Sequence, residues 1–595
     1  ERIAFLLAVG LFSGFLFFGL EVVWTHLIGA VLGNSIYAFA AMLALVLAGL
    51  GIGGALSTRL LREERPISGG ALGAMLLAGS LLLAWQFTLW PRIPNEFIRW
   101  GGGLTTFAQG EMLRWAQAAR LLLPPAIVFG MVYPALFRME AFPLRRRARH
   151  AAALGAMNSV GCVLGALLTG FFLIPALGSE ATLILFGTLA LAAGVLVALA
   201  HDRGWRRAGV AAAGLALVFV WSNRPAWDRL ALTSGGHVYF KPAFVGPATR
   251  LLYLQEDTLG GITTVVENPR SSGPGSTRTL LSNGKFQASD SGERLAQTGF
   301  ALVPILHSTG RDDALVIGLG SGQTAEVVSR MGFRRIDVAE IAPGIVEAAD
   351  AYFDHINGKV LRRPGVRLRL EDGRNHLLLT DRAYDLIAIE ISSIWFAGST
   401  SLYCEEFFEL TRRRLRPGGV LQQWVQVHHL GMDEIGSIVA TMRRVYPHVS
   451  FWLVGGQGIL VASVEPQRLQ PGSLEAAVRT NPWRENSPLA TSERLVSLLC
   501  SRLLSSADVD RFLASRPFRV NTDANRYLEY ATPRYNLDPR PLDAMNRNTL
   551  ALFARFEGQE VAPGPASEVS DLLIRVTPER QREVLGLRRP SPGSP

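Results

Sequence analysis

The sequence predicts a chain in two parts, a multi-pass α-helical membrane domain followed by an α/β domain with a doubly wound parallel sheet. Two observations predict this fold class: seven long apolar segments precede residue 225, and apolar strands then alternate with helical stretches. The predicted boundaries are 1–225 for the membrane domain, 226–310 for a small β-rich subdomain, 311–465 for the α/β domain and 466–595 for a helical extension with a flexible tail.

Seven apolar segments are long enough, or nearly so, to cross a bilayer, since a spanning helix needs about 20 apolar residues. The fourth and seventh segments are the shortest, and Pro124 and Pro125 predict a kink in the fourth. The segments are roughly Ile3–His26, Ile36–Thr58, Gly70–Trp90, Leu121–Phe137, Ala151–Leu177, Ala181–Ala200 and Ala208–Trp221. We therefore expect the lipid bilayer as a partner.

Arginines gather in the loops on one side of these segments. That side carries Arg59, Arg62, Arg65, Arg138, Arg145, Arg146, Arg147, Arg149, Arg203, Arg206 and Arg207, and the other carries Arg92, Arg99 and Arg114. The positive-inside rule makes the arginine-rich side cytoplasmic. Seven crossings would then place the C-terminal half outside the cytoplasm, whereas the supply of a nucleoside cofactor favours the cytoplasm. The side of the membrane on which the C-terminal half lies therefore stays open.

The net charge of +10 does not indicate a nucleic-acid-binding protein. Residues 1–225 contain 17 arginines, no lysine and nine acidic residues, so they account for +8 of this charge. Such basicity is typical of loops beside membrane spans, and no basic patch with interleaved aromatic residues is found, so we expect no nucleic-acid partner. The three cysteines, Cys162, Cys404 and Cys500, are too scattered to predict a disulfide framework or a metal site.

Glu21 is an acidic residue within the first apolar segment. An ionised carboxylate in hydrocarbon is costly, so such residues are often part of a substrate or proton path. A hydrogen bond between helices, or a position near the membrane interface, would explain Glu21 equally well. We treat it as a candidate substrate residue beside these structural alternatives.

The most informative stretch is Ala314–Glu326, in which an apolar run meets Gly318, Gly320 and Gly322 and then continues with helix-forming residues. This pattern predicts a buried strand, a tight turn and a helix whose N-terminus faces a ligand. Glycine is needed because a Cβ would keep the backbone away from a nucleoside. The sequence therefore predicts a nucleoside site at this turn.

Acidic residues follow the next three predicted strands, at 335–340, 366–371 and 384–390. In a doubly wound sheet, ligands bind at the carboxyl ends of the strands. Glu340, 22 residues after Gly318, is placed to accept both ribose hydroxyls, Asp372 before Gly373 to hold an adenine amino group, and Glu390 to face the reacting end of the cleft. Each residue alone could be an ordinary polar residue at a strand end.

The glycine spacing favours S-adenosylmethionine-type ligands over dinucleotides. A dinucleotide fingerprint would have a further glycine where Gln323 stands. We therefore predict an S-adenosylmethionine-type ligand as co-substrate, and no metal.

These residues resemble the spermidine synthase (polyamine aminopropyltransferase) family over about residues 250–450. The matching motifs are Gly318–Gly322, Glu340, Asp372-Gly373, Tyr384–Glu390, Leu402-Tyr403 and Pro417-Gly418-Gly419, with Gly284-Lys-Phe-Gln287 upstream. The resemblance implies a Rossmann-like methyltransferase/spermidine synthase fold, and it adds Gln287 to the cofactor site. With the N-terminal half included, the chain is similar to bacterial proteins that fuse a major-facilitator-like membrane half to a spermidine synthase. Those proteins share short motifs with this chain, such as Glu21-Val-Val-Trp-Thr and Asn283-Gly-Lys. This resemblance implies a location in the bacterial inner (plasma) membrane.

The sequence departs from this family where the acceptor amine would bind. The family's Asp-Ser-Ser/Thr-Asp run is replaced by Glu390–Ser393, which leaves Glu390 as the candidate catalytic acid and Ser393 at the second acidic position. The family's Asp-Glu-x-x-Tyr-His-Glu cluster falls on Gly292–Thr298, where only Glu293 is kept. The resemblance therefore implies an amine-type acceptor without identifying it.

Three hypotheses follow. The first is a membrane-integrated transferase that moves an aminopropyl or methyl group to an amine, with Glu390 positioning or deprotonating the nucleophile. The second is a transporter or sensor whose soluble domain binds a nucleoside or polyamine without catalysis. The third is a structural subunit, which the intact glycines and acids argue against. Resemblance also implies a homodimer.

Overall fold

The computed structural model describes residues 2–60, 67, 69–138, 147–201, 205–270, 274–391, 393–485, 487–535, 541–553 and 575–585. Several predicted features lie outside the described residues, namely the loop arginines Arg62, Arg65, Arg145, Arg146 and Arg203, Ser392 of the acceptor run, and most of the tail after Ala562.

The chain folds as two compact units. The first consists of Glu1–Pro247, Leu254–Thr264 and Ser282–Lys285, and the second of Ala248–Tyr253, Val265–Leu281 and Phe286–Pro595. The residues predicted as a separate β-rich subdomain, 226–310, are thus divided between the two units.

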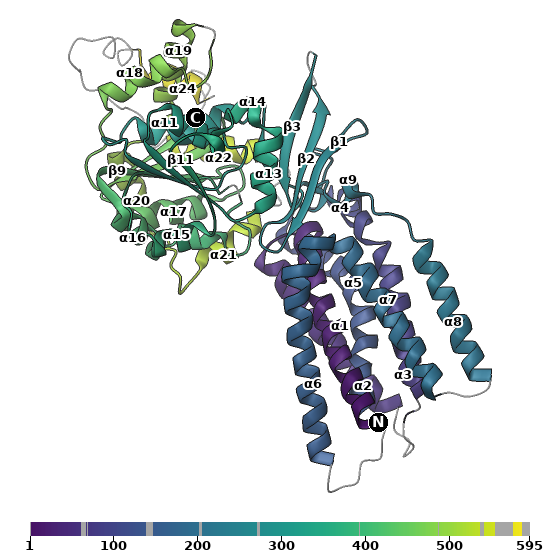
Figure 1. The fold of residues 1–595 in the computed structure, drawn as a ribbon. Coiled ribbons are helices and arrows are strands. Elements are labelled where there is room, and N and C mark those ends of the chain that lie inside the picture. Colours follow the sequence, from purple (N-terminus) through teal and green to yellow (C-terminus); the bar gives the residue numbers. More distant parts are fainter. Residues whose placement is uncertain are drawn as a thin grey trace. The chain divides into compact units, whose positions relative to one another are not determined.

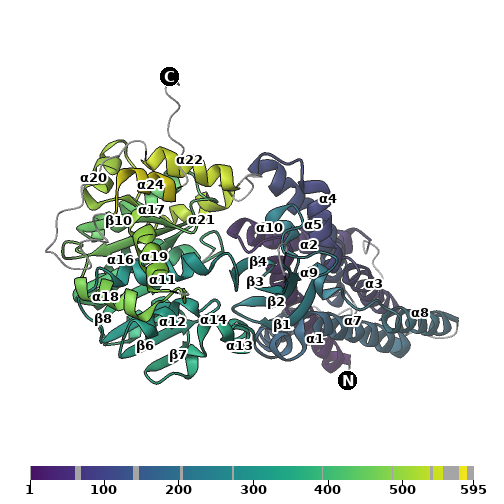
Figure 2. The same ribbon diagram turned by 90° about the horizontal axis from the view of Figure 1, so that it is seen from above.

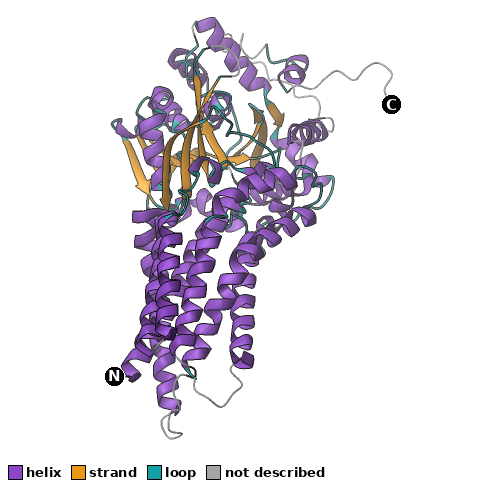
Figure 3. Ribbon diagram, turned by 90° about the vertical axis from the view of Figure 1, so that its right-hand side faces the viewer, coloured by secondary structure: helices purple, strands orange, loops and turns teal. Residues whose placement is uncertain are grey.

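The first unit is a bundle of long apolar helices (Figures 1 and 3). Its helices are α1 (Arg2–Val31), α2 (Ile36–Leu60), α3 (Gly69–Phe87), α4 (Ile93–Gly101), α5 (Phe107–Leu136), α6 (Arg147–Leu168), the π-helix η3 (Thr169–Leu173), α7 (Ile174–His201), α8 (Trp205–Ser222), α9 (Arg229–Leu232) and α10 (Gly236–Tyr239). The closest pairs are α1 with α6, α2 with α5 and α3 with α7. Glycines allow this approach, since a Cβ on Gly161 would lie 2.0 Å from the Leu11 carbonyl oxygen.

Five helical stretches of this unit are long and apolar enough to cross a membrane. They are Ile3–Val31, Ile36–Arg59, Gly69–Gly101, Phe107–Leu136 and Ala148–Ala200. This count does not confirm the seven predicted spans, for two reasons. Two predicted segments form the single stretch Ala148–Ala200, in which Gly178 adopts the non-helical φ of 77°, and the last apolar helix, Arg207–Ser222, is shorter than the others.

A four-stranded sheet follows, with the strand order β1-β2-β3-β4. The strands are β1 (Arg250–Asp257), β2 (Gly261–Pro269), β3 (Ser276–Ser282) and β4 (Lys285–Ser289). The β1–β2 and β3–β4 turns belong to the first unit, and the opposite ends of the strands belong to the second.

The second unit contains an eight-stranded sheet of order β12-β10-β11-β9-β8-β5-β6-β7 (Figure 2). Strands β5 (Asp313–Ile317), β6 (Arg335–Glu340), β7 (Val366–Leu370), β8 (Tyr384–Ile389) and β9 (Leu415–Val425) are parallel, and β10 (His448–Val454), β11 (Gln457–Ser463) and β12 (Arg502–Leu504) extend the sheet antiparallel. The predicted doubly wound parallel sheet is confirmed. Because β5 pairs with both β6 and β8, the strand order reverses beside it, which places the ligand crevice at the carboxyl end of β5.

Helices cover both faces of this sheet because alternate residues of each buried strand point to opposite sides. Val316 and Ala388 pack in the cluster that includes α11 (Arg294–Ile305) and α12 (Gln323–Arg330), whereas Ile317 and Ile389 pack in the cluster that includes α16 (Glu405–Arg414) and α17 (Met432–Val445). The helices are α11 (Arg294–Ile305), α12 (Gln323–Arg330), α13 (Pro343–Tyr352), α14 (Asp354–Asn357), α15 (Gly373–Leu379), α16 (Glu405–Arg414), α17 (Met432–Val445), α18 (Pro471–Thr480), α19 (Pro488–Cys500), α20 (Ser506–Ala514), α21 (Tyr527–Ala531), α22 (Pro541–Phe553) and α24 (Pro578–Val584).

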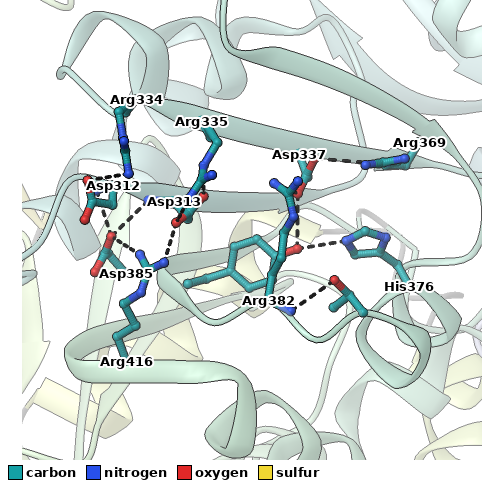
Figure 4. Close-up of polar contacts among 12 residues, drawn as sticks. Asp312, Asp313, Arg334, Arg335, Asp337, Arg369, His376, Arg382, Asp385 and Arg416 are labelled. Carbon is teal, nitrogen blue, oxygen red and sulfur yellow. Dashed lines mark hydrogen bonds and ion pairs between the residues drawn. The ribbon is translucent and has the colours of Figure 1, made fainter.

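Arginine–aspartate pairs join the amino ends of the central strands (Figure 4). Asp313 at the start of β5 accepts hydrogen bonds from Arg335, at 2.6 and 2.9 Å, and from Arg416, which also contacts Asp385 at 2.9 Å. This network lies at the edge of the sheet opposite the ligand crevice, so we assign it to stability.

Candidate functional site

The glycine turn between β5 and α12 forms the centre of the site. Gly318, Gly320 and Gly322 have φ angles of 92°, 54° and 81°, a backbone region that favours glycine. A Cβ on Gly318 would lie 3.3 Å from both Cβ and the carbonyl oxygen of Glu390. The turn therefore passes directly beside the end of β8, as the sequence predicted from the shared edge of the sheet.

Glu340 fixes the position of this turn. Its Oε2 accepts a hydrogen bond from the Leu319 amide at 2.9 Å, and its Oε1 accepts from the amides of Ile341 and Ala342 at 2.8 and 3.0 Å. The buried carboxylate thus links the glycine turn to the end of β6. Its predicted contact with ribose hydroxyls stays a prediction.

Asp372 and Gly373 begin α15 at the end of β7. Asp372 is the N-cap, and its carboxylate accepts a hydrogen bond from the Asn375 amide at 2.8 Å. A Cβ on Gly373 would lie 2.4 Å from Cγ2 of Ile317, the last residue of β5, so this position requires glycine for packing. Asp372 is half-buried and lies at the same edge as Glu340.

Glu390 follows the last residue of β8, and its Oε1 atom is buried with no hydrogen-bond partner among the described residues. Burial raises the pKa of this carboxyl well above its ordinary value. A hydrogen bond with Thr324 acts in the opposite direction, and the nearby charge of Glu293 raises the pKa further. The carboxyl groups of Glu390 and Glu293 therefore lie close enough for the charge of one to act on the other.

Glu293 is hydrogen-bonded to a glutamine, which in turn is hydrogen-bonded to a tryptophan. The Gln457 side-chain amide donates to Glu293 Oε1 at 3.3 Å, and its oxygen accepts from Trp424 Nε1 at 3.0 Å. Sequence reasoning missed Gln457 and Trp424, because β9 and β11 meet Glu293 only through the antiparallel pairing of these strands. The charge of Glu293 acts on the Glu390 carboxyl, and the roles predicted for both residues stay predictions.

The positions at which the family keeps acceptor acids have another role here. Ser321 of the glycine turn donates to the Gln297 side-chain oxygen at 2.8 Å, and Gln323 donates to the Thr298 hydroxyl at 3.0 Å. These polar side chains of α11 hold the glycine turn instead of facing an amine. All residues of α11 from Ala296 to Ile305 are buried, so no amphipathic sequence pattern signals this role.

The other predicted residues are placed as follows. Gln287 is half-buried in β4, where the neighbouring Ala288 lies 3.9 Å from the position of a Cβ on Gly320. Ser393 is buried in the loop after β8. Glu21 lies in the first unit, half-buried in α1, and its carbonyl oxygen accepts a hydrogen bond from Thr25 at 2.8 Å.

The C-terminal extension holds the loop that follows β8. Glu529 accepts hydrogen bonds from the Gly398 amide at 2.8 Å and from the Thr400 hydroxyl. The Asn521 side chain donates to the Tyr403 carbonyl at 3.1 Å. The sequence predicts a helical extension here, and these contacts form a strut that holds the loop after β8.

One group among the described residues has the composition of a metal site: Cys404, Glu406 and Asp523, whose ligand atoms lie within 4.8 Å of one another. Arg374 contacts both oxygens of Asp523, at 2.8 and 2.5 Å. The guanidinium therefore already supplies the positive charge that a cation would bring.

Together these features define a Rossmann-like domain with a nucleoside-type glycine turn and a pair of carboxyl groups at the carboxyl edge of its sheet. Residues 295–454 match the family described as the spermine/spermidine synthase domain. The C-terminal half thus carries a spermine/spermidine synthase domain, and the chain is a homologue of the polyamine aminopropyltransferases.

Two relatives illustrate the extent of the likeness. Polyamine aminopropyltransferase 2 of Pseudomonas aeruginosa is 29% identical over 175 residues, which cover 29% of this chain and 50% of that protein. Polyamine aminopropyltransferase 2 of Streptomyces coelicolor is 28% identical over 409 residues, covering 66% of this chain and 68% of that protein. The second match is longer than the whole of residues 226–595, so the likeness extends into the apolar N-terminal half.

Among solved structures, the spermidine synthase of Thermotoga maritima aligns with 38% of this chain and 78% of its own, at 17% identity and a TM-score of 0.34. A probable spermidine synthase of Corynebacterium glutamicum aligns with 46% of this chain and 97% of its own, at 16% identity and a TM-score of 0.33.

Proposed function

We propose that this chain is a membrane-integrated, aminopropyltransferase-like enzyme that transfers an alkyl group to an amine acceptor. The observation that carries the proposal is the buried carboxyl of Glu390, which lies beside Glu293 and against the glycine turn. The family match supports decarboxylated S-adenosylmethionine as co-substrate, with S-adenosylmethionine as the alternative. The same match does not favour a transporter or sensor without catalysis.

Residues of the second unit fit such a co-substrate. The three glycines leave the turn open to a nucleoside, Glu340 and Asp372 lie at the strand ends to either side, and Gln287 lies on the strand that passes Gly320. When bound, the sulfonium supplies an electrophilic carbon, to which the acceptor nitrogen bonds as the carbon–sulfur bond breaks and the electron pair passes to sulfur.

Glu390 has the role of proton acceptor in this proposal. An amine attacks only as the free base, so the proton of the acceptor ammonium passes to the Glu390 carboxylate. A raised pKa makes this carboxylate a stronger base, and Glu293 is placed to attract the ammonium while both groups are ionised. Gln297 and Thr298 are not acids, and they hydrogen-bond to Ser321 and Gln323, so the acceptor pocket keeps fewer acids than the family pattern has.

The test is release of the thioether nucleoside by full-length protein in detergent, given decarboxylated S-adenosylmethionine and a panel of primary amines. We expect release that depends on an amine and falls by about 100-fold or more in Glu390→Gln, since general-base catalysis contributes about 10²–10⁴-fold. Glu409→Gln, an exposed glutamate of α16, is the matched control. Amine-dependent release that is equal in both variants would rule out Glu390 as the proton acceptor.

We further propose a bacterial plasma-membrane location with seven crossings. The non-helical backbone of Gly178 interrupts Ala148–Ala200, and a reversal there would let this stretch cross twice and make α8 the seventh crossing. Single cysteines placed in the α2–α3 loop and in α18, labelled from either side of oriented vesicles, would locate the second unit. Labelling of both positions from the same side would contradict seven crossings.

A further inference from the structure

A cavity of about 310 Å³ lies within the first unit. Its walls come from α1, the start of α2, the junction of η3 with α7, and the two turns of the four-stranded sheet. Its polar lining consists of Thr25, His26, Asn34, Thr258 and Asn283, and the rest is mostly apolar. The volume is at the lower end of the range for small-molecule pockets, roughly 300–1,000 Å³.

Glycines and a π-helix create this space. A Cβ on Gly29 of α1 would meet only Phe39 at 3.9 Å and Asn34 at 4.0 Å, both ordinary contact distances. Gly170, also in the wall, lies in the π-helix η3, and its carbonyl accepts a hydrogen bond from Thr258 of the β1–β2 turn. π-Helical turns of this kind are frequent at functional sites.

His26 in the wall pairs with Glu256, a buried carboxylate that is not itself among the lining residues. His26 Nε2 lies 3.2 Å from Glu256 Oε2, and their side chains are only 8% and 9% exposed. The same oxygen accepts from the Ser179 amide at 2.9 Å. Burial alone would raise the pKa of Glu256, but His26 and Ser179 hold it below its ordinary value, so the carboxylate is ionised. In the neutral tautomer whose Nε2–H donates to Glu256, Nδ1 of His26 is the ring nitrogen that accepts a hydrogen bond.

The lining selects against anions. None of the described residues that line the cavity is Lys, Arg, Asp or Glu, and the nearby Lys285 is not among them. A ligand would meet acceptor atoms of imidazole, amide and hydroxyl groups, in the field of the Glu256 carboxylate. A primary ammonium, which donates three hydrogen bonds, satisfies such a lining, whereas an anion would face a negative field with no cation to pair with.

We propose that this cavity is a binding site for a small primary amine in its ammonium form. The cavity is lined by residues of two short sequence motifs that have no role in the proposed transferase chemistry. One motif ends in Thr25 of α1, and the other starts at Asn283 of the β3–β4 turn. None of its lining residues falls within the matched synthase domain, residues 295–454. The proposal therefore goes beyond the transferase function and does not depend on it.

The test is calorimetric titration of full-length protein in detergent with 1,4-diaminobutane. Gly29→Leu should fill the cavity without a backbone clash, and we expect the affinity of one binding site to fall by at least about tenfold. Gly51→Leu is the matched control, since a Cβ there meets nothing within 4 Å and the residue is exposed on α2. His26→Gln, which keeps a donor for Glu256 and removes the ring nitrogen, should weaken the same site.

Two comparisons make the outcome decisive. Glu390→Gln should leave the Gly29-dependent site intact, so the loss of the transferase function would not remove this site. The neutral isostere 1,4-butanediol should bind at least about tenfold more weakly. Diamine binding that is unchanged in both Gly29→Leu and His26→Gln would overturn the proposal, and equal binding of the diol would overturn the assignment to an amine.

Discussion

At the scale of single residues, the site depends on carboxylates placed in different surroundings. Glu340 is satisfied by three backbone amides, which suits a structural and ligand-holding anion. Glu390 has a buried oxygen without a partner among the described residues, and burial favours its protonated form. Groups with such opposed environments are typical of acid–base sites.

The pH dependence of transfer should reveal Glu390. Its folded pKa is raised, first by burial and then by Glu293, so the carboxylate that accepts the proton forms only as the pH rises through that raised value. We expect kcat/KM to increase with pH through this range, and Glu293→Gln to move the rise to lower pH. The measurement is a pH profile of thioether release, and a rise that does not move in Glu293→Gln would contradict the coupling of the two acids.

At the scale of elements, the sequence predicted those parts of the site that depend on a single strand and the turn after it. The glycine turn, Glu340, Asp372 and Glu390 each lie at a predicted strand end, because parallel strands place their carboxyl ends at one edge. Gln457, Trp424 and the contacts of Glu529 depend on antiparallel pairing and on distant packing. Local sequence patterns carry no signal for such contacts.

The strut formed by the C-terminal extension should control the mobility of the loop after β8. Glu529→Gln removes a charged acceptor that binds both the Gly398 amide and the Thr400 hydroxyl. Hydrogen bonds to charged groups contribute about 1.5–3 kcal/mol, so we expect amide exchange in residues 396–403 to accelerate by about 10–100-fold. Hydrogen–deuterium exchange measures this rate.

Glu583→Gln on α24 is the control for the strut, because Glu583 is an exposed residue whose partner is Arg580 within the same helix. Equal exchange of residues 396–403 in the two variants would show that the loop is ordered without the extension.

At the scale of the whole molecule, the arginine–aspartate network at the amino edge of the sheet stabilises the second unit (Figure 4). Burial would raise the pKa of Asp313, but Arg335 and Arg416 hold it below its ordinary value. A lowered folded pKa stabilises the fold above the unfolded pKa of about 4, and this contribution is lost as the pH falls below it.

Asp313→Asn should therefore destabilise the protein by about 1.5–3 kcal/mol near neutral pH, because it removes the charged acceptor of hydrogen bonds from two partly exposed arginines. It should also flatten the fall of stability between about pH 5 and pH 3. Thermal unfolding of the variant across this range, beside Asp312→Asn, checks both effects, since the Asp312 side chain is 62% exposed. An unchanged slope in Asp313→Asn would contradict the lowered pKa.

The apolar N-terminal half shows what the length of apolar segments alone does not predict. Each predicted segment coincides with helical residues, but the number of crossings depends on breaks such as Gly178, which a hydropathy pattern does not contain. The cavity beside His26 could not be predicted from the sequence either, because its lining comes from residues as distant in sequence as Thr25 and Asn283.

We propose that the second unit transfers an alkyl group from a sulfonium to an amine. The ratio of the two reaction products tests this transfer most directly. In a single turnover of full-length protein with decarboxylated S-adenosylmethionine and an amine, mass spectrometry should find the thioether nucleoside and the N-alkylated amine in equal amounts. Thioether nucleoside without alkylated amine, or neither product with any amine from either sulfonium, would contradict the claim.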